Sequence, residues 1–439
     1  MTATSPVAAL EALDNVLVLR PDSFGFAERR MVFNIAVDRH PTAIAIPRSL
    51  HAAREVARLL VTTATPFTIR AGGHNVRGTA VADGAVMVDL SLLRRVVLNR
   101  TTLEVTVEPG ALWGDIDTAL EQYSVAVPGG TVSHTGVAGL TLGGGVGWLA
   151  PFYGLSCDNL IALEYVDGAG QLRTATATDD LWAFRGAGSS LGFVTEFRFR
   201  AQPIPRHARG FRLEIDCDSA DAALTSATDL DMLQRRSLAI SPAFMKSPSG
   251  VATLYLDGLA WHGIRAVMRW LAASSEFSAR IVWTGTYYSL QRLFDTAQRF
   301  GRRNYWKTVS LSRVPGHLAH AWMETLDASP SPLSMITLDV LAGRVRTEPL
   351  GASAIAFRPA SALLLANAIW DSPELDASAI SWARKVVSLP EHDGLPPYSN
   401  YASQGDIAYL PSPSDRLAAV KRRLDPHGAF PDLPGHLIP

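Results

Sequence analysis

A histidine stands directly after two glycines in the segment Arg70-Ala71-Gly72-Gly73-His74-Asn75. Adjacent glycines can adopt positive φ and turn successive backbone N–H groups inward, so that they form a small concave site for an anion. With the charge of Arg70 beside it, such a site suits a diphosphate. From this motif alone, a tight turn that leaves His74 in solvent is an equally good interpretation.

A second segment, from Pro128 to Trp148, is unusually rich in glycine. Small residues at close spacing let two layers of backbone lie against a flat, phosphate-bearing ligand. Because glycine loses the most backbone entropy on folding, we expect neither a helix nor a strand between Gly129 and Gly147.

The same segment contains Gly145-Val146-Gly147-Trp148-Leu149-Ala150, which fits the dinucleotide-binding fingerprint G-x-G-x-x-A. A Rossmann unit needs an apolar strand before the first glycine and a helix after it. Here glycine and threonine precede Gly145, and Pro151 interrupts the helix that should follow. We therefore reject the Rossmann interpretation.

The overall composition favours a small-molecule site. The 439-residue chain is 47% hydrophobic and 18% charged, which predicts two domains or one large domain with an insertion. Its formal charge of −1 offers no basic face for nucleic acid. The histidines show no H-E-x-x-H spacing, and no G-x-S-x-G elbow follows a strand, so neither a metal enzyme nor a serine hydrolase is expected.

The two cysteines, Cys157 and Cys217, are too few for a disulfide framework, and we expect each to be an ordinary buried thiol. We also expect a cytoplasmic protein with no membrane partner. The sequence begins without the basic and apolar regions of a signal peptide, and no uncharged apolar run reaches the roughly 18 residues of a membrane helix.

Strands and helices alternate around these motifs. Apolar periodicity predicts strands over residues 42–49, 86–90, 96–98, 103–107 and 161–167, and helices over 50–61 and 113–122. The prolines at 203 and 205 indicate a domain boundary, after which strands are expected over 251–256, 335–341 and 354–357. A last helix is expected over 414–424.

Further segments complete an ordered set of motifs: Tyr153–Leu160, Asp180–Glu196, Asn304–Lys307, Phe357–Arg358, Tyr398–Tyr401 and Arg416–Phe430. In this order, the motifs up to Glu196 resemble the FAD-binding domain of the vanillyl-alcohol-oxidase superfamily, and specifically its berberine-bridge-enzyme-like branch. Asn304–Lys307 and Phe357–Arg358 resemble landmarks of that family's substrate domain. The resemblance covers nearly the whole chain. It implies an α+β, two-domain PCMH-type FAD-binding fold whose substrate domain is an antiparallel sheet covered by helices. The implied division is an FAD-binding domain over 1–205, a substrate-binding domain over 206–390, and a C-terminal return to the FAD-binding domain over 391–439.

The resemblance implies that His74 bonds covalently to the 8α-methyl carbon of FAD. Many members add a cysteine tether, but Val132 occupies that position here, so His74 is expected to be the only tether. We interpret Cys157 as a packed thiol rather than a replacement. The chain is therefore similar to the singly linked bacterial members such as hydroxynicotine oxidase. The cofactor contacts carried over are Arg70, Ala71, Gly72, Gly73, Asn75, Gly78, Thr131, His134, Thr135, Gly136, Gly139, Gly143, Gly144, Gly147, Trp148, Val194 and Asn400.

Tyr401 matches the second tyrosine of the family's Y-x-N-Y motif and is the candidate base, with Tyr398 competing for the role. A phenol with a pKa near 10 is a poor base at neutral pH unless a positive charge lowers its pKa. Arg358 or Lys307 could supply that charge, and both are predicted with Asp339 in the substrate pocket. A tyrosine that only packs on the flavin is the alternative.

We expect an oxidase that passes a hydride from a small alcohol, amine or natural-product intermediate to flavin N5, with O2 forming H2O2, in bacterial secondary metabolism. The resemblance places Thr135 where oxygen access is controlled. The partners of the enzyme would be a small-molecule substrate and O2, and the enzyme would be a monomer or a homodimer. Two alternatives are a redox-neutral cyclase that keeps FAD as a scaffold and a flavoprotein that sequesters a natural product without chemistry.

Overall fold

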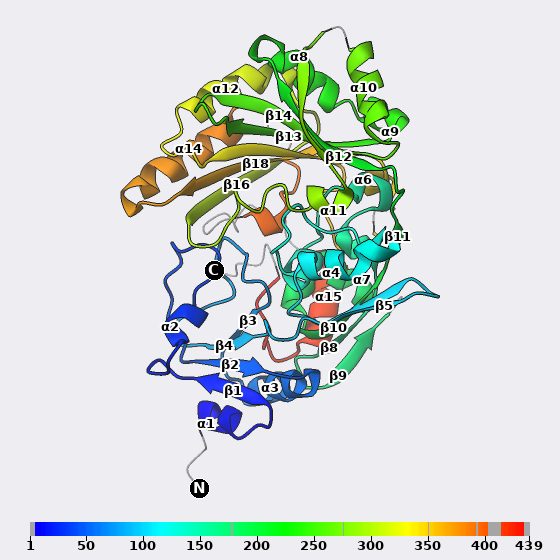
Figure 1. Ribbon diagram of the computed structural model, residues 1–439. Coiled ribbons are helices and arrows are strands. Elements are labelled where there is room, and N and C mark those ends of the chain that lie inside the picture. Colours follow the sequence, from blue (N-terminus) through cyan, green and yellow to red (C-terminus); the bar gives the residue numbers. More distant parts are fainter. Residues whose placement is uncertain are drawn as a thin grey trace.

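The computed structural model describes residues 5–176, 179–274, 276–349, 351–391, 394–402 and 414–433, and it has the predicted α+β class (Figure 1). Two smaller sheets and their helices form one half, and a seven-stranded sheet with its own helices forms the other. No helix within these ranges combines the length and the apolar character needed to traverse a bilayer.

The first sheet carries the histidine motif. Its strands are in the order β1-β2-β4-β3, with β2, β4 and β3 parallel. Helix α3 (Leu50–Thr62) follows β2 and buries residues three and four apart against the sheet, and the Ser49 side chain caps its first turn by accepting from Ala52 N–H at 3.1 Å. The histidine loop, residues 71–85, joins β3 to β4. The strands are β1 (Val16–Leu19), β2 (Ala43–Pro47), β3 (Phe67–Arg70) and β4 (Val86–Asp89). Helix α1 (Pro6–Glu11) precedes β1, and helix α2 (Phe26–Arg29) lies between β1 and β2.

The second sheet is antiparallel and carries the glycine-rich segment on its helices and loops. The C-terminal helix α15 (Asp415–Leu424) packs into the core of this part through Leu417, Val420 and Leu424, and Figure 1 shows it in red beside β10 and β8. The strands, in spatial order, are β5 (Val96–Asn99), β6 (Glu104–Val107), β10 (Phe193–Arg200), β8 (Leu160–Val166) and β9 (Leu172–Ala175). The helices are α4 (Trp113–Leu120), α5 (Val137–Leu142), α6 (Ala150–Tyr153) and α7 (Asp179–Ala187).

Helix α5 corrects the expectation that no helix forms within the glycine-rich segment. It is six residues long, and Val137, Ala138 and Leu142 are buried in the core of the second sheet. Tertiary packing of these apolar residues outweighs the entropy cost of Gly139 in the middle of the helix.

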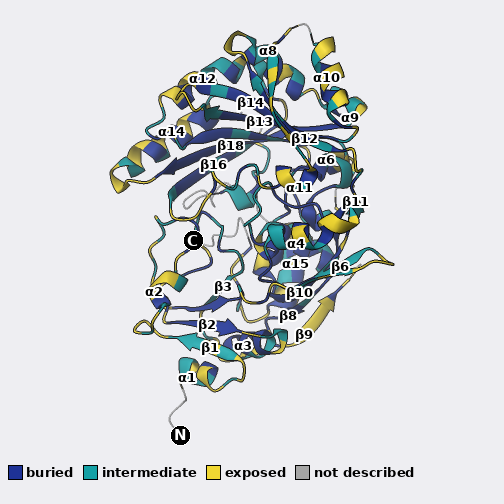
Figure 2. Cartoon of the chain, viewed as in Figure 1, coloured by how far each residue is buried: buried dark blue, intermediate teal, exposed yellow. Residues whose placement is uncertain are grey.

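The seven-stranded sheet is antiparallel throughout. Helices cover one of its faces, and Figure 2 shows buried strands beneath helices whose outer sides are exposed. In spatial order the strands are β15 (Ala279–Gly285), β12 (Arg209–Ile215), β14 (Ala252–Ala260), β13 (Leu238–Lys246), β17 (Met335–Val340), β18 (Ala362–Trp370) and β16 (Arg303–Leu311). The covering helices are α8 (Ala220–Ala227), α9 (Leu230–Arg236), α10 (Ile264–Ala273), α12 (Ala319–Asp327) and α14 (Asp376–Ser388). Two short helices, α11 (Tyr287–Leu290) and α13 (Arg344–Thr347), lie in the connections.

Alternation along the strands decides which side chains reach the opposite face. On β17, Ile336, Leu338 and Val340 belong to the helix-covered core. Successive side chains of a strand point to opposite faces, so Met335, Thr337 and Asp339 face the other half of the molecule. The sheet thus presents polar groups toward the glycine-rich segment.

A short two-stranded sheet of β7 (Val125–Ala126) and β11 (Gln202–Pro203) lies where the chain leaves the first half, and β12 opens the seven-stranded sheet at Arg209. The division at residues 205 and 390 stays a proposal. The predicted strand over 354–357 is wrong, because these residues are irregular. Ile355 and Phe357 are buried in one cluster with Tyr398, so their apolar run reflects packing between loops.

Candidate active site

A cavity of about 610 Å³ lies between the glycine-rich segment and the seven-stranded sheet. This volume is in the range of ligand-binding pockets. One wall, which we call the glycine wall, includes the histidine loop, the glycine-rich segment, Val194 and residues Phe430–Leu433. The other, which we call the sheet wall, is lined by Ser241, Phe294, Gln298, Trp306, Met335, Thr337, Asp339, Leu365 and Asn367. Tyr398–Tyr401 joins the two walls.

His74 lies in the cavity lining, on the loop that leaves β3. Its ring stacks on Phe33 at 3.9 Å between centroids and lies 5.1 Å from the ring of His134. Burial, and to a lesser degree His134, lowers the pKa of His74 to about 3. The imidazole is therefore neutral at pH 7 and keeps a lone pair with which it can act as a nucleophile.

The glycines let two loops approach each other closely. A Cβ at Gly72 would lie 2.4 Å from the backbone nitrogen of Gly136, and a Cβ at Gly143 would lie 2.2 Å from Oδ1 of Asn400. Both distances are too short for any side chain. At Gly72 the obstacle is the backbone of Gly136, so close contact between these two loops requires glycine, whereas a side chain at Gly143 would force the Asn400 amide to move.

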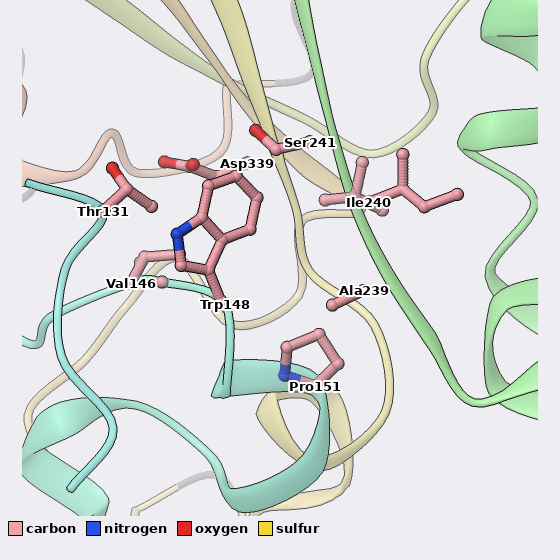
Figure 3. A pocket seen from close by; sticks show the side chains of 10 residues that line it. Thr131, Val146, Trp148, Pro151, Ala239, Ile240, Ser241 and Asp339 are labelled. Carbon is pink, nitrogen blue, oxygen red and sulfur yellow. The ribbon is translucent and has the colours of Figure 1, made fainter. Parts of the chain in front are cut away.

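Most of the cofactor contacts carried over by resemblance line this cavity: Ala71, Gly72, Gly73, Asn75, Thr131, Thr135, Gly136, Gly139, Gly143, Val194 and Asn400. Gly147 and Trp148 line a smaller recess of about 20 Å³ next to it, together with Thr131 and Asp339. In Figure 3 the Trp148 ring stands between Thr131 and the sheet residues Ser241 and Ile240. Gly78, His134 and Gly144 are not among the described lining residues of either space.

Arg70 is placed differently from the expectation that it binds a diphosphate. Its guanidinium donates to the carbonyl of Arg29 at 2.6 Å and lies 3.8 Å from the buried carboxylate of Asp89 on β4. It does not belong to the described cavity lining. The charge of Arg70 compensates a buried carboxylate and supports the base of the histidine loop.

Val132, which the resemblance aligns with the second tether, lines the cavity with an apolar side chain. Cys157 is fully buried in a cluster with Ile355, Phe357 and Tyr398, outside the described lining. Burial, followed by the charge of Asp158, raises the pKa of the Cys157 thiol well above its usual value. This thiol is an inert packed group, because the thiolate is the reactive form. Cys217 is exposed, which corrects the expectation that both thiols are buried.

Tyr398 and Tyr401 contact each other at 4.7 Å between ring centroids, but their hydroxyls have different surroundings. The Tyr398 oxygen accepts hydrogen bonds from Gly145 N–H at 3.0 Å and from the Asn400 amide at 2.9 Å. Its hydroxyl thereby fixes the glycine-rich segment. Tyr401 donates its hydroxyl proton to Oδ2 of Asp339 at 2.8 Å.

Asp339 is the carboxylate that can receive a proton in this part of the cavity. Burial raises its pKa to about 6, against the opposing effect of the hydrogen bond from Tyr401. Burial and the charge of Asp339 raise the pKa of Tyr401 well above its usual value. Tyr401 is therefore a neutral phenol at pH 7, and Asp339 is the group that can hold the extra charge.

The positive charges expected beside Tyr401 lie elsewhere. Arg358 is buried and bonds to the carboxylate of Asp158 at 2.5 and 3.1 Å and to Ser353 at 2.8 Å. Lys307 on β16 shares a sheet face with Tyr305 and Leu311, which belong to the helix-covered core. Neither residue is in the described cavity lining, which corrects the expectation that they lower the pKa of Tyr401.

Several lining residues had no place among the sequence-based candidates, including Arg77, Gln298, Thr337 and Asn367. Thr337 alternates with apolar residues on the strand that carries Asp339, so the period-two pattern was a usable signal for it. Gln298 lies in an irregular segment without periodicity, and only the folded structure brings it to β17 and β18.

Comparison with known proteins finds a family model that matches the part of the chain with the histidine motif and the glycine-rich segment. Residues 41–176 match the family model described as an FAD binding domain. (R)-6-hydroxynicotine oxidase of Paenarthrobacter nicotinovorans is 32% identical over 197 residues, which are 43% of this chain and 42% of the relative.

Two solved structures share the whole fold. Glucooligosaccharide oxidase of Acremonium strictum, which has a 6-S-cysteinyl, 8α-N1-histidyl FAD, gives a TM-score of 0.84 at 22% identity and covers 98% of each chain. Berberine-bridge-enzyme-like protein 1 of Physcomitrella patens gives 0.82 at 21% identity, again over 98% of each chain. The predicted resemblance and the predicted two-domain fold are confirmed.

Proposed function

We propose that this chain, an FAD-linked oxidoreductase with the berberine-bridge-enzyme-like fold, is an oxidase that holds FAD through His74 alone and removes a hydride from a small alcohol, amine or natural-product intermediate. The proposal includes reoxidation by O2 to H2O2 and a role in bacterial secondary metabolism. The observation that carries it is the hydrogen bond between Tyr401 and Asp339, in the same cavity as His74.

The residues present fit a flavin. The cavity wall at Gly72, Gly136 and Gly143 is backbone, which a flat ring system and its phosphates can approach closely. Nε2 of His74 is buried without a hydrogen-bond partner among the described residues. These features support a cofactor that lies along the glycine wall and ends at His74.

Bound FAD would supply a two-electron acceptor that takes hydride at N5 and passes the electrons to O2. The sheet wall must then dispose of the proton that leaves the substrate hydroxyl or amine. Tyr401 takes this proton on its oxygen while its own proton moves to Oδ2 of Asp339. Because Asp339 ends with the proton, no phenolate is required at neutral pH, and no positive charge beside Tyr401 is needed.

His74 attaches the cofactor through its neutral imidazole, and Val132 offers no sulfur for a second bond. Cys157 lies buried outside the lining, so we do not assign it a tether. Thr135 lines the cavity in the glycine wall, where its branched side chain would control the approach of O2.

The function is tested by mixing the purified yellow protein under nitrogen with a panel of primary alcohols, secondary alcohols and cyclic amines. A member of the panel should bleach the flavin absorbance, and admission of air should restore it with one H2O2 formed per cycle. Product formation without bleaching and without peroxide would contradict the oxidase proposal in favour of redox-neutral chemistry.

A further inference from the structure

The sheet wall carries a second polar group besides the Tyr401–Asp339 pair. Gln298 precedes β16 and Asn367 lies on β18, and both line the cavity. Their side chains are buried, with 6% and 2% of the residue surface exposed. Nε2 of Gln298 donates to Oδ1 of Asn367 at 3.3 Å and lies 3.7 Å from the sulfur of Met335.

The surrounding strands fix the orientation of both amides. The Asn367 amide nitrogen donates to the carbonyl of Leu365 at 3.3 Å and to Oγ1 of Thr337 at 3.2 Å. A backbone carbonyl can only accept, so the amide nitrogen of Asn367 must face Leu365 and its oxygen must face Gln298. Two amide oxygens cannot bond to each other, so Gln298 must turn its nitrogen toward Asn367. Its oxygen is left to point elsewhere.

That oxygen, Oε1 of Gln298, is buried and has no hydrogen-bond partner among the described residues. Buried amide oxygens in folded proteins nearly always accept a hydrogen bond, and an unsatisfied one requires an explanation. Since the side chain lines the cavity, a donor on a bound molecule would satisfy it.

The neighbouring groups narrow the chemistry of that molecule. Apolar surface from Phe294, Trp306, Met335 and Leu365 lines the same wall. Ser241 gives its hydroxyl proton to the carbonyl of Leu338 at 2.7 Å, so it also offers an acceptor. Arg77, on the opposite histidine loop, is the only lysine or arginine in the described lining, so this wall has no cation for a carboxylate or phosphate.

We propose that Gln298 is a specificity-determining residue that accepts a hydrogen bond from a hydroxyl or N–H group of the substrate. The substrate is then a largely apolar, ring-bearing molecule without an acidic group and with two hydrogen-bond donors. One donor is the reacting group at Tyr401, and the other binds Gln298. This inference rests on the proposed function, because it takes the cavity to be a substrate site.

The test measures binding without turnover. The flavin-loaded protein is titrated calorimetrically with 2-naphthol and with 2-methoxynaphthalene, which has the same rings but no donor. The wild type should bind 2-naphthol about tenfold more tightly, equivalent to about 1.4 kcal/mol at 25 °C. Gln298→Leu should weaken 2-naphthol binding about tenfold and leave the ether within about twofold.

The matched control is Gln291→Leu. Gln291 is a buried glutamine with 1% exposure that bonds to Asp117 and does not line the described cavity. It should leave both affinities unchanged. Gln298→Met, a flexible unbranched replacement, serves as a second variant, and thermal melting verifies that each protein is folded.

Equal weakening of both probes by Gln298→Leu would overturn the proposal and leave Gln298 a packing role. A changed flavin spectrum in the probe-free variant would overturn it too, because the oxygen would then serve the cofactor. Failure of the wild type to bind 2-naphthol at millimolar concentration would have the same consequence. Selective 2-naphthol binding together with no flavin bleaching by any panel member would instead contradict the proposed function.

Discussion

The two walls of the cavity are built in different ways. The glycine wall is mainly backbone, held together at Gly72, Gly136 and Gly143, where any side chain would collide. The sheet wall is made of side chains from strands and from an irregular segment, and its polar groups are Asp339, Gln298 and their neighbours. A backbone wall suits a cofactor whose shape does not vary, whereas exchangeable side chains suit the choice of substrate.

Tyr401→Phe should have the largest effect, and it distinguishes chemistry on the sheet wall from cofactor binding on the glycine wall. Tyr401→Phe removes the oxygen that we propose takes the substrate proton and keeps the ring that contacts Tyr398. We expect anaerobic flavin bleaching to slow by about 10²–10⁴-fold, with flavin content unchanged. Loss of flavin from this variant would show that the sheet wall also holds the cofactor.

Arg358 tests whether a buried ion pair outside the cavity lining stabilises the fold without affecting the reaction. Its ion pair with Asp158 is buried, with side-chain exposures of 2% and 8%, and lies outside the described lining. Arg358→Met leaves an unpaired buried carboxylate and should lower the free energy of unfolding by about 3–5 kcal/mol, measured by denaturant titration. The bleaching rate per folded molecule should stay the same. A slower rate with unaltered stability would restore Arg358 as a charge acting on Tyr401.

The pH dependence of kcat/KM should follow the ionisation of the Asp339 carboxylate. Its carboxylate accepts the proton only when ionised, and burial raises its pKa to about 6. We therefore expect kcat/KM to be level above about pH 6 and to fall about tenfold per unit below it. Asp339→Asn should be slower and should lack this inflection. An inflection near pH 6 that persists in Asp339→Asn would assign it to another group.

The smallest effect is expected on the glycine wall at Thr135. Thr135→Val keeps the branched shape and removes the hydroxyl. We expect the rate of flavin reoxidation by air to change by less than about threefold, equivalent to under about 0.7 kcal/mol. The rate is followed by rapid mixing of bleached protein with oxygenated buffer. A change of about a hundredfold would show that the hydroxyl itself governs O2 access.

The contrast between the walls also explains what the sequence could predict. The glycine wall was found through local motifs, because close approach of backbone demands glycine at fixed positions, and Asn75, Thr135 and Asn400 line the cavity as expected. The predicted strands and helices around it agree with β2, α3, β4, β6 and α4. Helix α5 was missed because its stability comes from tertiary packing of Val137, Ala138 and Leu142.

The positions of positively charged residues are the least predictable from the sequence. Arg70, Lys307 and Arg358 were assigned to the cavity by their position near motifs, and the structure directs each away from the described lining. The partner of a charge is distant in sequence, as Asp158 is from Arg358, so no local pattern contains it. The same reason hid Gln298, whose orientation depends on β17 and β18 together.

We propose that His74 is the sole covalent attachment of the cofactor on the glycine wall. The direct measurement is acid precipitation of the purified protein, proteolysis of the pellet, and mass spectrometry of every flavin-bearing peptide, with His74→Ala and Cys157→Ala in parallel. We expect one such peptide, containing His74, in the wild type and in Cys157→Ala, and none in His74→Ala. Release of all flavin on precipitation, or a flavin-bearing peptide that contains Cys157, would contradict a single tether at His74.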